Sequence, residues 1–178
     1  MELVKDVNLT LVLRLFATFL LVLSACLVAF DSQTKLLFYS ILRKASFRDL
    51  NALFVLVCID SAAAAYNVLQ ILRCSIFPSP KVDKNLAWLC YLLDQAVVYL
   101  AFAANSAALQ GSLFAITGQN NFQWMKLCNI YTRFCIQIGG ALVCGFIACL
   151  VLAVISALSA YSLFRLYSPK HFLQLKAK

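Results

Sequence analysis

Four long apolar runs constrain the fold of this chain more than any other feature. They cover residues 9–30, 50–72, 85–109 and 134–164. Each run is long enough to cross the hydrocarbon core of a bilayer, which takes about 20 residues of helix. Because lipid offers no hydrogen-bonding partner to an unpaired backbone, each run is predicted to be helical. We therefore predict an all-α integral membrane protein, a four-transmembrane-helix bundle that forms one domain over residues 1–178.

The composition agrees with a membrane protein and argues against a soluble domain. The chain is 63% hydrophobic and 12% charged, with a formal net charge of +8. Soluble domains carry about 25% charged residues, roughly twice as many. The cations lie mainly at the ends of the apolar runs, where they indicate topology and contact with anionic headgroups. Membrane lipids are therefore expected partners, and nucleic acid is not.

The distribution of the cations predicts the orientation. With both termini cytoplasmic, eight Lys and Arg residues lie on the inner side, six lie on the outer side, and Arg14 lies within the first run. Because inner loops carry an excess of Lys and Arg, this count favours cytoplasmic termini. An alternative comes from Leu23–Cys26, since a bacterial lipoprotein cleavage box there would remove the first run. That run is longer than a typical signal core, which favours a retained span.

Three charged residues inside the runs are the main candidate site. A lone charge in hydrocarbon costs at least about 2.5 kcal/mol, so these residues need partners. Arg14 and Asp94 lie in runs of the same direction, at depths that let the two side chains meet as a bidentate ion pair. We interpret this pair as an internal lock between helices; the alternative is an ion or proton pathway. Asp60 is placed at comparable depth, where it either competes for Arg14 or stays protonated.

A stripe of small residues in the fourth run is a candidate packing surface. Its members recur every four residues: Ala141, Gly145, Cys149, Ala153 and Ala157. Small side chains let two helix backbones approach closely in a membrane. The stripe indicates packing within the bundle, with a dimer interface as the alternative.

The eight cysteines include no pair with the C-x₂-C spacing of a zinc or redox site. Cys128 and Cys135 fall near the outer end of the fourth run, where they form either a disulfide or two free thiols. Cys74, beside Arg73 at the inner boundary, is a palmitoylation candidate. The single histidine, His171, lies in the basic tail, so no Ser-His-Asp or Cys-His set can form inside the membrane. We predict no enzyme activity, no cofactor and no metal.

Several short segments together resemble a known family. They are Arg14 in the first run, Tyr91–Ala96 (YLLDQA) followed by Ala103–Ala108 (AANSAA) in the third, and Trp124, Cys128 and Phe134-Cys135 before the fourth. These segments are similar to the plant Casparian strip membrane protein-like family, within the wider MARVEL-type group of four-span proteins. In that resemblance Asp60 falls where relatives often carry Asn.

The resemblance implies a function as well as a fold. It implies a plasma-membrane protein that forms homo- or heteromeric assemblies, organises the membrane as a scaffold, and recruits cell-wall-modifying enzymes. The basic first outer loop, residues 35–48, departs from the outer-loop signature of the founding members, which favours a related membrane-organising role. The rival hypothesis is a small channel or transporter, which would require polar residues along a continuous path.

Overall fold

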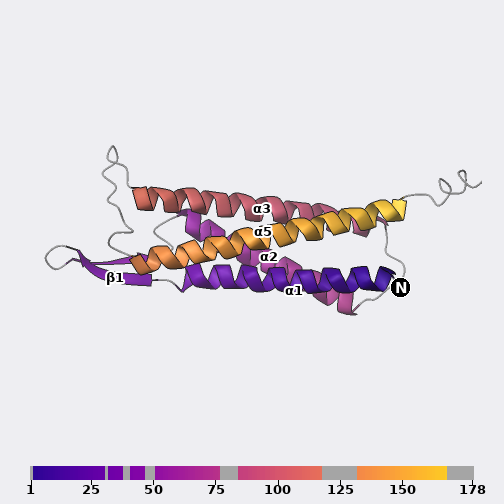
Figure 1. Cartoon of the computed structure of the whole chain (residues 1–178), viewed down its shortest axis with the longest axis horizontal. Coiled ribbons are helices and arrows are strands. Elements are labelled where there is room, and N and C mark those ends of the chain that lie inside the picture. Colours follow the sequence, from indigo (N-terminus) through magenta and orange to yellow (C-terminus); the bar gives the residue numbers. More distant parts are fainter. Residues whose placement is uncertain are drawn as a thin grey trace, which may run out of the picture.

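The structure, a computed structural model, describes residues 2–30, 32–37, 41–46, 51–76, 84–117 and 132–167. Its elements are α1 (Glu2–Ala29), β1 (Ser32–Leu37), β2 (Ile41–Ser46), α2 (Asn51–Ile76), α3 (Lys84–Thr117) and α5 (Thr132–Tyr167). The four long helices lie side by side (Figure 1). Within the described residues, these helices hold four stretches long and apolar enough to cross a membrane: Asn8–Ala29, Asn51–Ile76, Asn85–Phe114 and Cys135–Phe164. The predicted four-span helical architecture is confirmed.

The first connection contains a hairpin that the apolar pattern did not predict. β1 and β2 pair antiparallel, with Lys35 opposite Arg43 and Leu37 opposite Ile41. The hairpin lies beyond the end of the bundle at which α1 ends and α5 begins (Figure 1). An isolated two-stranded hairpin is marginally stable at best, and the long apolar runs that mark the spans do not mark short strands of this kind.

The helices form a ring in which each one packs against two neighbours. The principal contacts join α1 to α2, α2 to α3, α3 to α5, and α5 back to α1. This order places α1 and α3 across the diagonal of the bundle. The two run in the same chain direction, and α2 and α5 run the opposite way (Figure 1). A link between α1 and α3 therefore has to be made by long side chains through the middle of the bundle.

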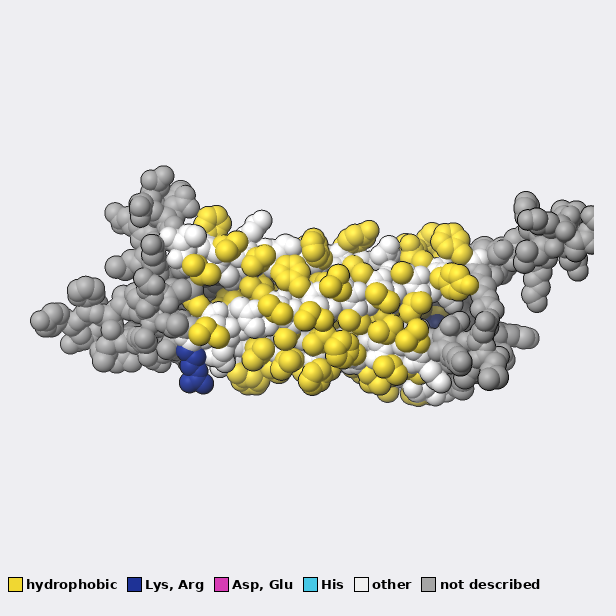
Figure 2. Space-filling model, viewed as in Figure 1, with side chains coloured by type: hydrophobic (Ala, Val, Ile, Leu, Met, Phe, Trp, Pro, Cys, Tyr) yellow, Lys and Arg dark blue, Asp and Glu magenta, His cyan; other side chains and the backbone are white. Residues whose placement is uncertain are grey.

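Two apolar clusters fill the interior. The first holds Ala17, Leu20, Leu21, Ala63, Ala64, Ala101, Ala148, Cys149, Leu152 and Ile155. The second holds Val28, Leu53, Leu56, Ala104, Ala108, Ile138, Ala141 and Leu142. Many members are alanines, which let the helix backbones approach closely. Leucines and isoleucines fill much of the rest of the interior, and many other large apolar side chains lie exposed on the outside, including Phe19, Phe102 and Leu150. In Figure 2 hydrophobic groups extend over the described length of the visible face. This exposed apolar surface is the part of the bundle that would contact lipid.

Candidate functional site

Arg14 of α1 and Asp94 of α3 form an ion pair across the diagonal of the bundle. The Arg14 Nη2 atom lies 2.8 Å from Asp94 Oδ2 and 3.0 Å from Oδ1. The two side chains are only 7% and 3% exposed. The pair is not the predicted two-nitrogen fork, since one guanidinium nitrogen serves both carboxylate oxygens. The second nitrogen is thereby left to bind another residue.

That second nitrogen contacts an amide on α2. Arg14 Nη1 donates to Asn67 Oδ1 at 3.2 Å. The amide nitrogen of Asn67 donates to the Ala63 carbonyl oxygen at 2.9 Å, one turn earlier on the same helix. This second bond fixes the amide so that its oxygen faces the guanidinium. α2 therefore takes part in a link that joins α1 to α3.

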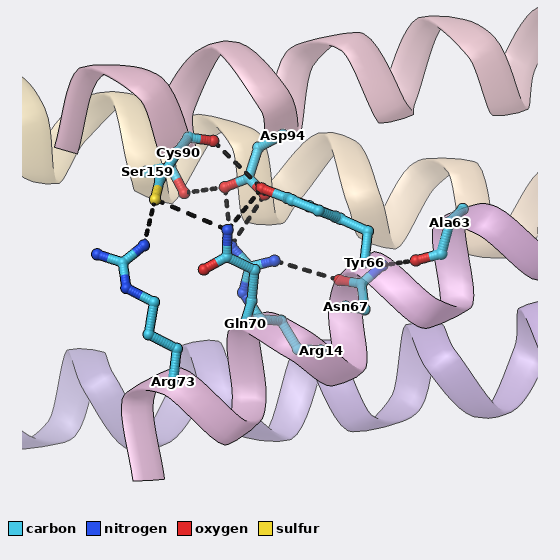
Figure 3. A network of polar contacts seen from close by, with 9 residues as sticks. All are labelled: Arg14, Ala63, Tyr66, Asn67, Gln70, Arg73, Cys90, Asp94 and Ser159. Atoms are coloured by element: carbon cyan, nitrogen blue, oxygen red, sulfur yellow. Dashed lines mark hydrogen bonds and ion pairs between the residues drawn. The ribbon is translucent and has the colours of Figure 1, made fainter. Parts of the chain in front are cut away.

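Two hydroxyl groups complete the coordination of the Asp94 carboxylate. The Tyr66 hydroxyl donates to Oδ1 at 2.8 Å, and the Ser159 hydroxyl donates to Oδ2 at 2.6 Å. Each carboxylate oxygen thus accepts one hydroxyl hydrogen bond besides its contact with Arg14 (Figure 3). We call this set the ion-pair layer: Arg14, Tyr66, Asn67, Asp94 and Ser159. All four helices contribute to it, its charges cancel, and both charged groups are hydrogen-bonded.

The network continues toward the end of α2. Gln70 Nε2 donates to the Tyr66 hydroxyl at 2.9 Å, and that hydroxyl also lies 3.3 Å from the Cys90 carbonyl oxygen. Beyond it, Arg73 Nη1 lies 2.7 Å from Cys90 Sγ (Figure 3). Sequence reasoning gave no role in this site to Gln70, Cys90 or Ser159. Tyr66, Gln70 and Arg73 recur at three- to four-residue spacing, and this pattern could have predicted a polar face on α2. Ser159 is an isolated serine in an apolar span, and nothing in the sequence marks it as part of the site.

Asp60 does not take part in the ion-pair layer, so of the two alternatives for this residue the structure does not support competition for Arg14. It lies seven residues before Asn67 on α2, about 10 Å away along the helix axis. Its side chain is fully buried, and Oδ2 accepts a hydrogen bond from the Ser24 hydroxyl of α1 at 2.8 Å. Its Oδ1 atom has no partner among the described residues.

A second buried amide is Asn105 of α3, whose side chain, like that of Asn67, donates a hydrogen bond to a backbone carbonyl of its own helix. Its Nδ2 atom donates to the Ala101 carbonyl oxygen at 2.9 Å and lies 3.9 Å from Cys149 Sγ of α5. Its Oδ1 atom is buried without a partner among the described residues. We call this second set the acid–amide layer: Ser24, Asp60, Asn105 and Cys149. All four helices contribute to this layer too, with one residue each.

The predicted small-residue stripe divides between two faces of α5. Ala141, Gly145 and Cys149 are buried, but Ala153 and Ala157 are exposed. The single-face prediction is wrong because four residues turn a helix by about 400°, so the stripe winds by about 40° at each step. Gly145 has a specific role, since an added Cβ would collide with the Asn105 amide, with Cγ only 2.8 Å away.

The predicted cysteine sites are only partly within the described structure. Cys135, near the start of α5, is disulfide-bonded. Its predicted partner Cys128 lies outside the described residues, so the pairing stays a prediction. Cys74 is an exposed free thiol near the end of α2, and its palmitoylation also stays a prediction. The described residues contain no group of three or more His, Cys, Asp and Glu side chains that could hold a metal ion.

Comparison with known proteins places the chain among plant membrane proteins. The Casparian strip membrane protein domain matches residues 6–151. CASP-like protein 2C1 of Vitis vinifera is 57% identical over 170 residues, which cover 92% of this chain and 82% of the relative. CASP-like protein 2C1 of Populus trichocarpa is 54% identical and covers 93% of each chain. CASP-like protein XL3 of Gossypium hirsutum is 54% identical over 92% of this chain and 93% of its own length. No solved structure gives a significant match.

Proposed function

This chain belongs to the Casparian strip membrane protein family, and we propose that it is a plasma-membrane scaffold. In this proposal both termini are cytoplasmic, and the chain self-associates or assembles with other family members into membrane platforms. Such platforms would recruit cell-wall-modifying enzymes to the outer surface. The domain match and the names of the relatives support the membrane-organising part of the proposal.

The observation that carries the proposal is the saturation of the ion-pair layer. Arg14 and Asp94 neutralise each other, and Asn67, Tyr66 and Ser159 fill their hydrogen-bonding positions. The first apolar cluster, which includes Leu21 and Leu152, separates this layer from the acid–amide layer. Ser156 is the one buried polar side chain between the two layers in the described helices, and a single hydroxyl does not make a continuous polar path. This favours a structural role over a channel or transporter.

The outer face of α5 supports self-association. Gly139 and Gly140 are exposed, and an added Cβ at either position would meet no heavy atom within 4 Å. A glycine inside a helix costs about 1 kcal/mol of stability relative to alanine. Within the described part of the chain, nothing packs closely enough against Gly139 or Gly140 to require glycine there. Gly145 differs, because the Asn105 amide leaves no room for a side chain. Close approach of another helix would account for the two exposed glycines, because small residues are enriched where membrane helices meet.

The test measures mobility and assembly of a fluorescently tagged chain at the plant plasma membrane. We expect slow recovery after photobleaching, together with crosslinked multimers. Gly140→Leu should speed the recovery and reduce the multimers, because the new side chain has room within its own bundle. Ala96→Leu, which puts the same leucine side chain at an exposed position of α3, is the matched control.

Fast recovery of an uncrosslinked monomer would overturn the scaffold proposal. The next measurement would then be current across reconstituted bilayers, and a current that Asp60→Asn abolishes would favour a channel. Enzyme recruitment is tested separately by proximity labelling from a tag in the first connection, in the unmodified chain and in Gly140→Leu. Labelling of wall-modifying enzymes that does not depend on assembly would contradict the platform mechanism.

A further inference from the structure

The acid–amide layer lies deep in the bundle, away from the ion-pair layer. Ser24 follows Arg14 by ten residues, and Asn105 follows Asp94 by eleven, so the two layers are about 15 Å apart along the helices. The first apolar cluster lies between them, and the second lies on the far side of the acid–amide layer. Polar groups in this layer are therefore enclosed by apolar side chains in both directions along the bundle.

The Asp60 carboxylate has no counter-charge in the described part of the chain. The one ion pair found there commits Arg14 to Asp94. Asp60 is 0% exposed, and its single hydrogen bond, from Ser24, reaches only Oδ2. An ionised carboxylate in a low-dielectric interior is strongly unfavourable unless a positive charge accompanies it. Asp60 thus requires a cation or a proton that the neighbouring side chains do not provide.

A second unpartnered acceptor lies in the same layer. Because the Asn105 amide nitrogen is held by the Ala101 carbonyl, its Oδ1 atom is the end of the amide left without a partner. Asp60 and Asn105 are both 0% exposed, and each lies where the first and the second apolar clusters meet on its own helix. The Cys149 sulfur of α5 lies 3.9 Å from Asn105 Nδ2 at the same level. Two buried acceptors without a donor indicate a small positively charged or hydrogen-donating occupant.

We propose that Asp60 and Asn105 form an occluded binding site for one monovalent cation, held either as a proton on the carboxyl group or as Na⁺. A proton on Asp60 Oδ1 makes the residue neutral and gives that atom a hydrogen to donate toward Asn105 Oδ1. A sodium ion instead takes the two Oδ1 atoms as ligands and balances the carboxylate charge. In both forms the Ser24 hydroxyl orients the carboxyl group. Ser24 from α1 hydrogen-bonds to Asp60. The other buried polar or titratable groups of this layer are Asn105 from α3 and the Cys149 thiol from α5.

The experiment uses the full-length protein in lipid nanodiscs. Infrared spectroscopy over a pH series reports whether Asp60 carries a proton, through a carboxylic-acid C=O band that Asp60→Asn removes. Thermal unfolding in NaCl against choline chloride reports a sodium ion, through a higher unfolding temperature in NaCl that Asp60→Asn abolishes. Asn105→Ala removes the second acceptor and should weaken proton or sodium binding about fivefold, the effect of one hydrogen bond.

The infrared and thermal-unfolding measurements together identify the cation, and they can also contradict the proposal. An Asp60 band at neutral pH assigns the proton, and a sodium-dependent unfolding temperature assigns Na⁺. An ionised Asp60 with equal unfolding temperatures in the two salts at every pH would overturn the proposal. The unmodified chain alone gives that result, so the test does not depend on the folding of the variants. Neither measurement reports assembly, and the scaffold proposal stands or falls independently.

Discussion

The ion-pair layer and the acid–amide layer contain similar residues but differ in how completely those residues are partnered. Each has one aspartate, one asparagine that bonds the backbone of its own helix, and one serine that donates to the aspartate. The ion-pair layer adds Arg14 and Tyr66, and every carboxylate oxygen has a donor. The acid–amide layer adds only a thiol, and two acceptors remain unpartnered among the described residues.

This difference shows that the supply of donors, rather than the presence of an acid, decides what a buried carboxylate does in lipid. Where a guanidinium and two hydroxyls surround Asp94, the charge is retained and links the diagonal helices. Where one hydroxyl contacts Asp60, the charge has to be neutralised by something outside the protein's own side chains. We predict that the first arrangement locks the helices together, and the second is the proposed cation site.

The largest expected effect comes from breaking the ion-pair layer on one side. Asp94→Ala leaves the Arg14 guanidinium buried without a counter-charge, which should cost about 3–5 kcal/mol of folding free energy. We expect aggregation on purification and retention in the secretory pathway, measured as the yield of monodisperse protein and as surface fluorescence. Removing both charges, in Arg14→Leu with Asp94→Leu, should restore much of that yield. Normal surface levels for Asp94→Ala would contradict the lock.

A smaller effect is expected from crowding the acid–amide layer. Gly145→Ala places a methyl group against the Asn105 amide, and overpacking of this kind should lower the free energy of unfolding by about 1–3 kcal/mol. Gly140→Ala on the same helix has open space and should be neutral or stabilising by up to about 1 kcal/mol. Denaturation in detergent, under monomeric conditions, compares the two variants. Equal stabilities would show that Asn105 moves aside without cost.

Removing one hydrogen-bond donor from the ion-pair layer should have a smaller effect again. Tyr66→Phe deletes a hydroxyl that binds Asp94 at 2.8 Å but leaves Arg14 and Ser159 in place. We expect a loss of about 1 kcal/mol in the free energy of unfolding. Tyr99→Phe, at a tyrosine that is 67% exposed, is the control and should be indistinguishable from the unmodified chain. A loss no greater than that of the control would mean that the hydroxyl is redundant.

The smallest effect is expected from Asp60→Asn, the isosteric replacement of the acid in the acid–amide layer. Asp60→Asn keeps an oxygen for Ser24 and adds hydrogens that can face Asn105, so the free energy of unfolding should change by less than about 1 kcal/mol. Asp60→Leu leaves the Ser24 hydroxyl without its acceptor and should cost more, about 1–3 kcal/mol. Chemical denaturation of both variants measures the difference. A loss for Asp60→Asn as large as that for Asp94→Ala would show that the negative charge of Asp60 is needed.

Much of the architecture follows from local chemistry. Long apolar runs in lipid have to form helices, and the parallel direction of the first and third helices brings Arg14 and Asp94 to one level. The level of Asp60 does not follow in the same way. It depends on how far α2 slides past α1 and α3, and a slip of one turn moves a side chain by about 5.4 Å. The connections do not specify that slip, so the sequence predicts only a comparable depth for Asp60, and its hydrogen bond with Ser24 comes from the tertiary structure.

By itself the sequence determined the four spans, their alternating directions, the family, and the need for partners to the buried charges. Only the tertiary structure decided which partners those are. It assigned Tyr66 and Ser159 to the Asp94 carboxylate and Asn67 to the Arg14 guanidinium. It also left Asp60 with a single hydroxyl and divided the α5 stripe between an inner and an outer face. The physical reason is that hydropathy is a property of each segment, whereas hydrogen-bond partnership depends on the rotation and register of four helices packed together.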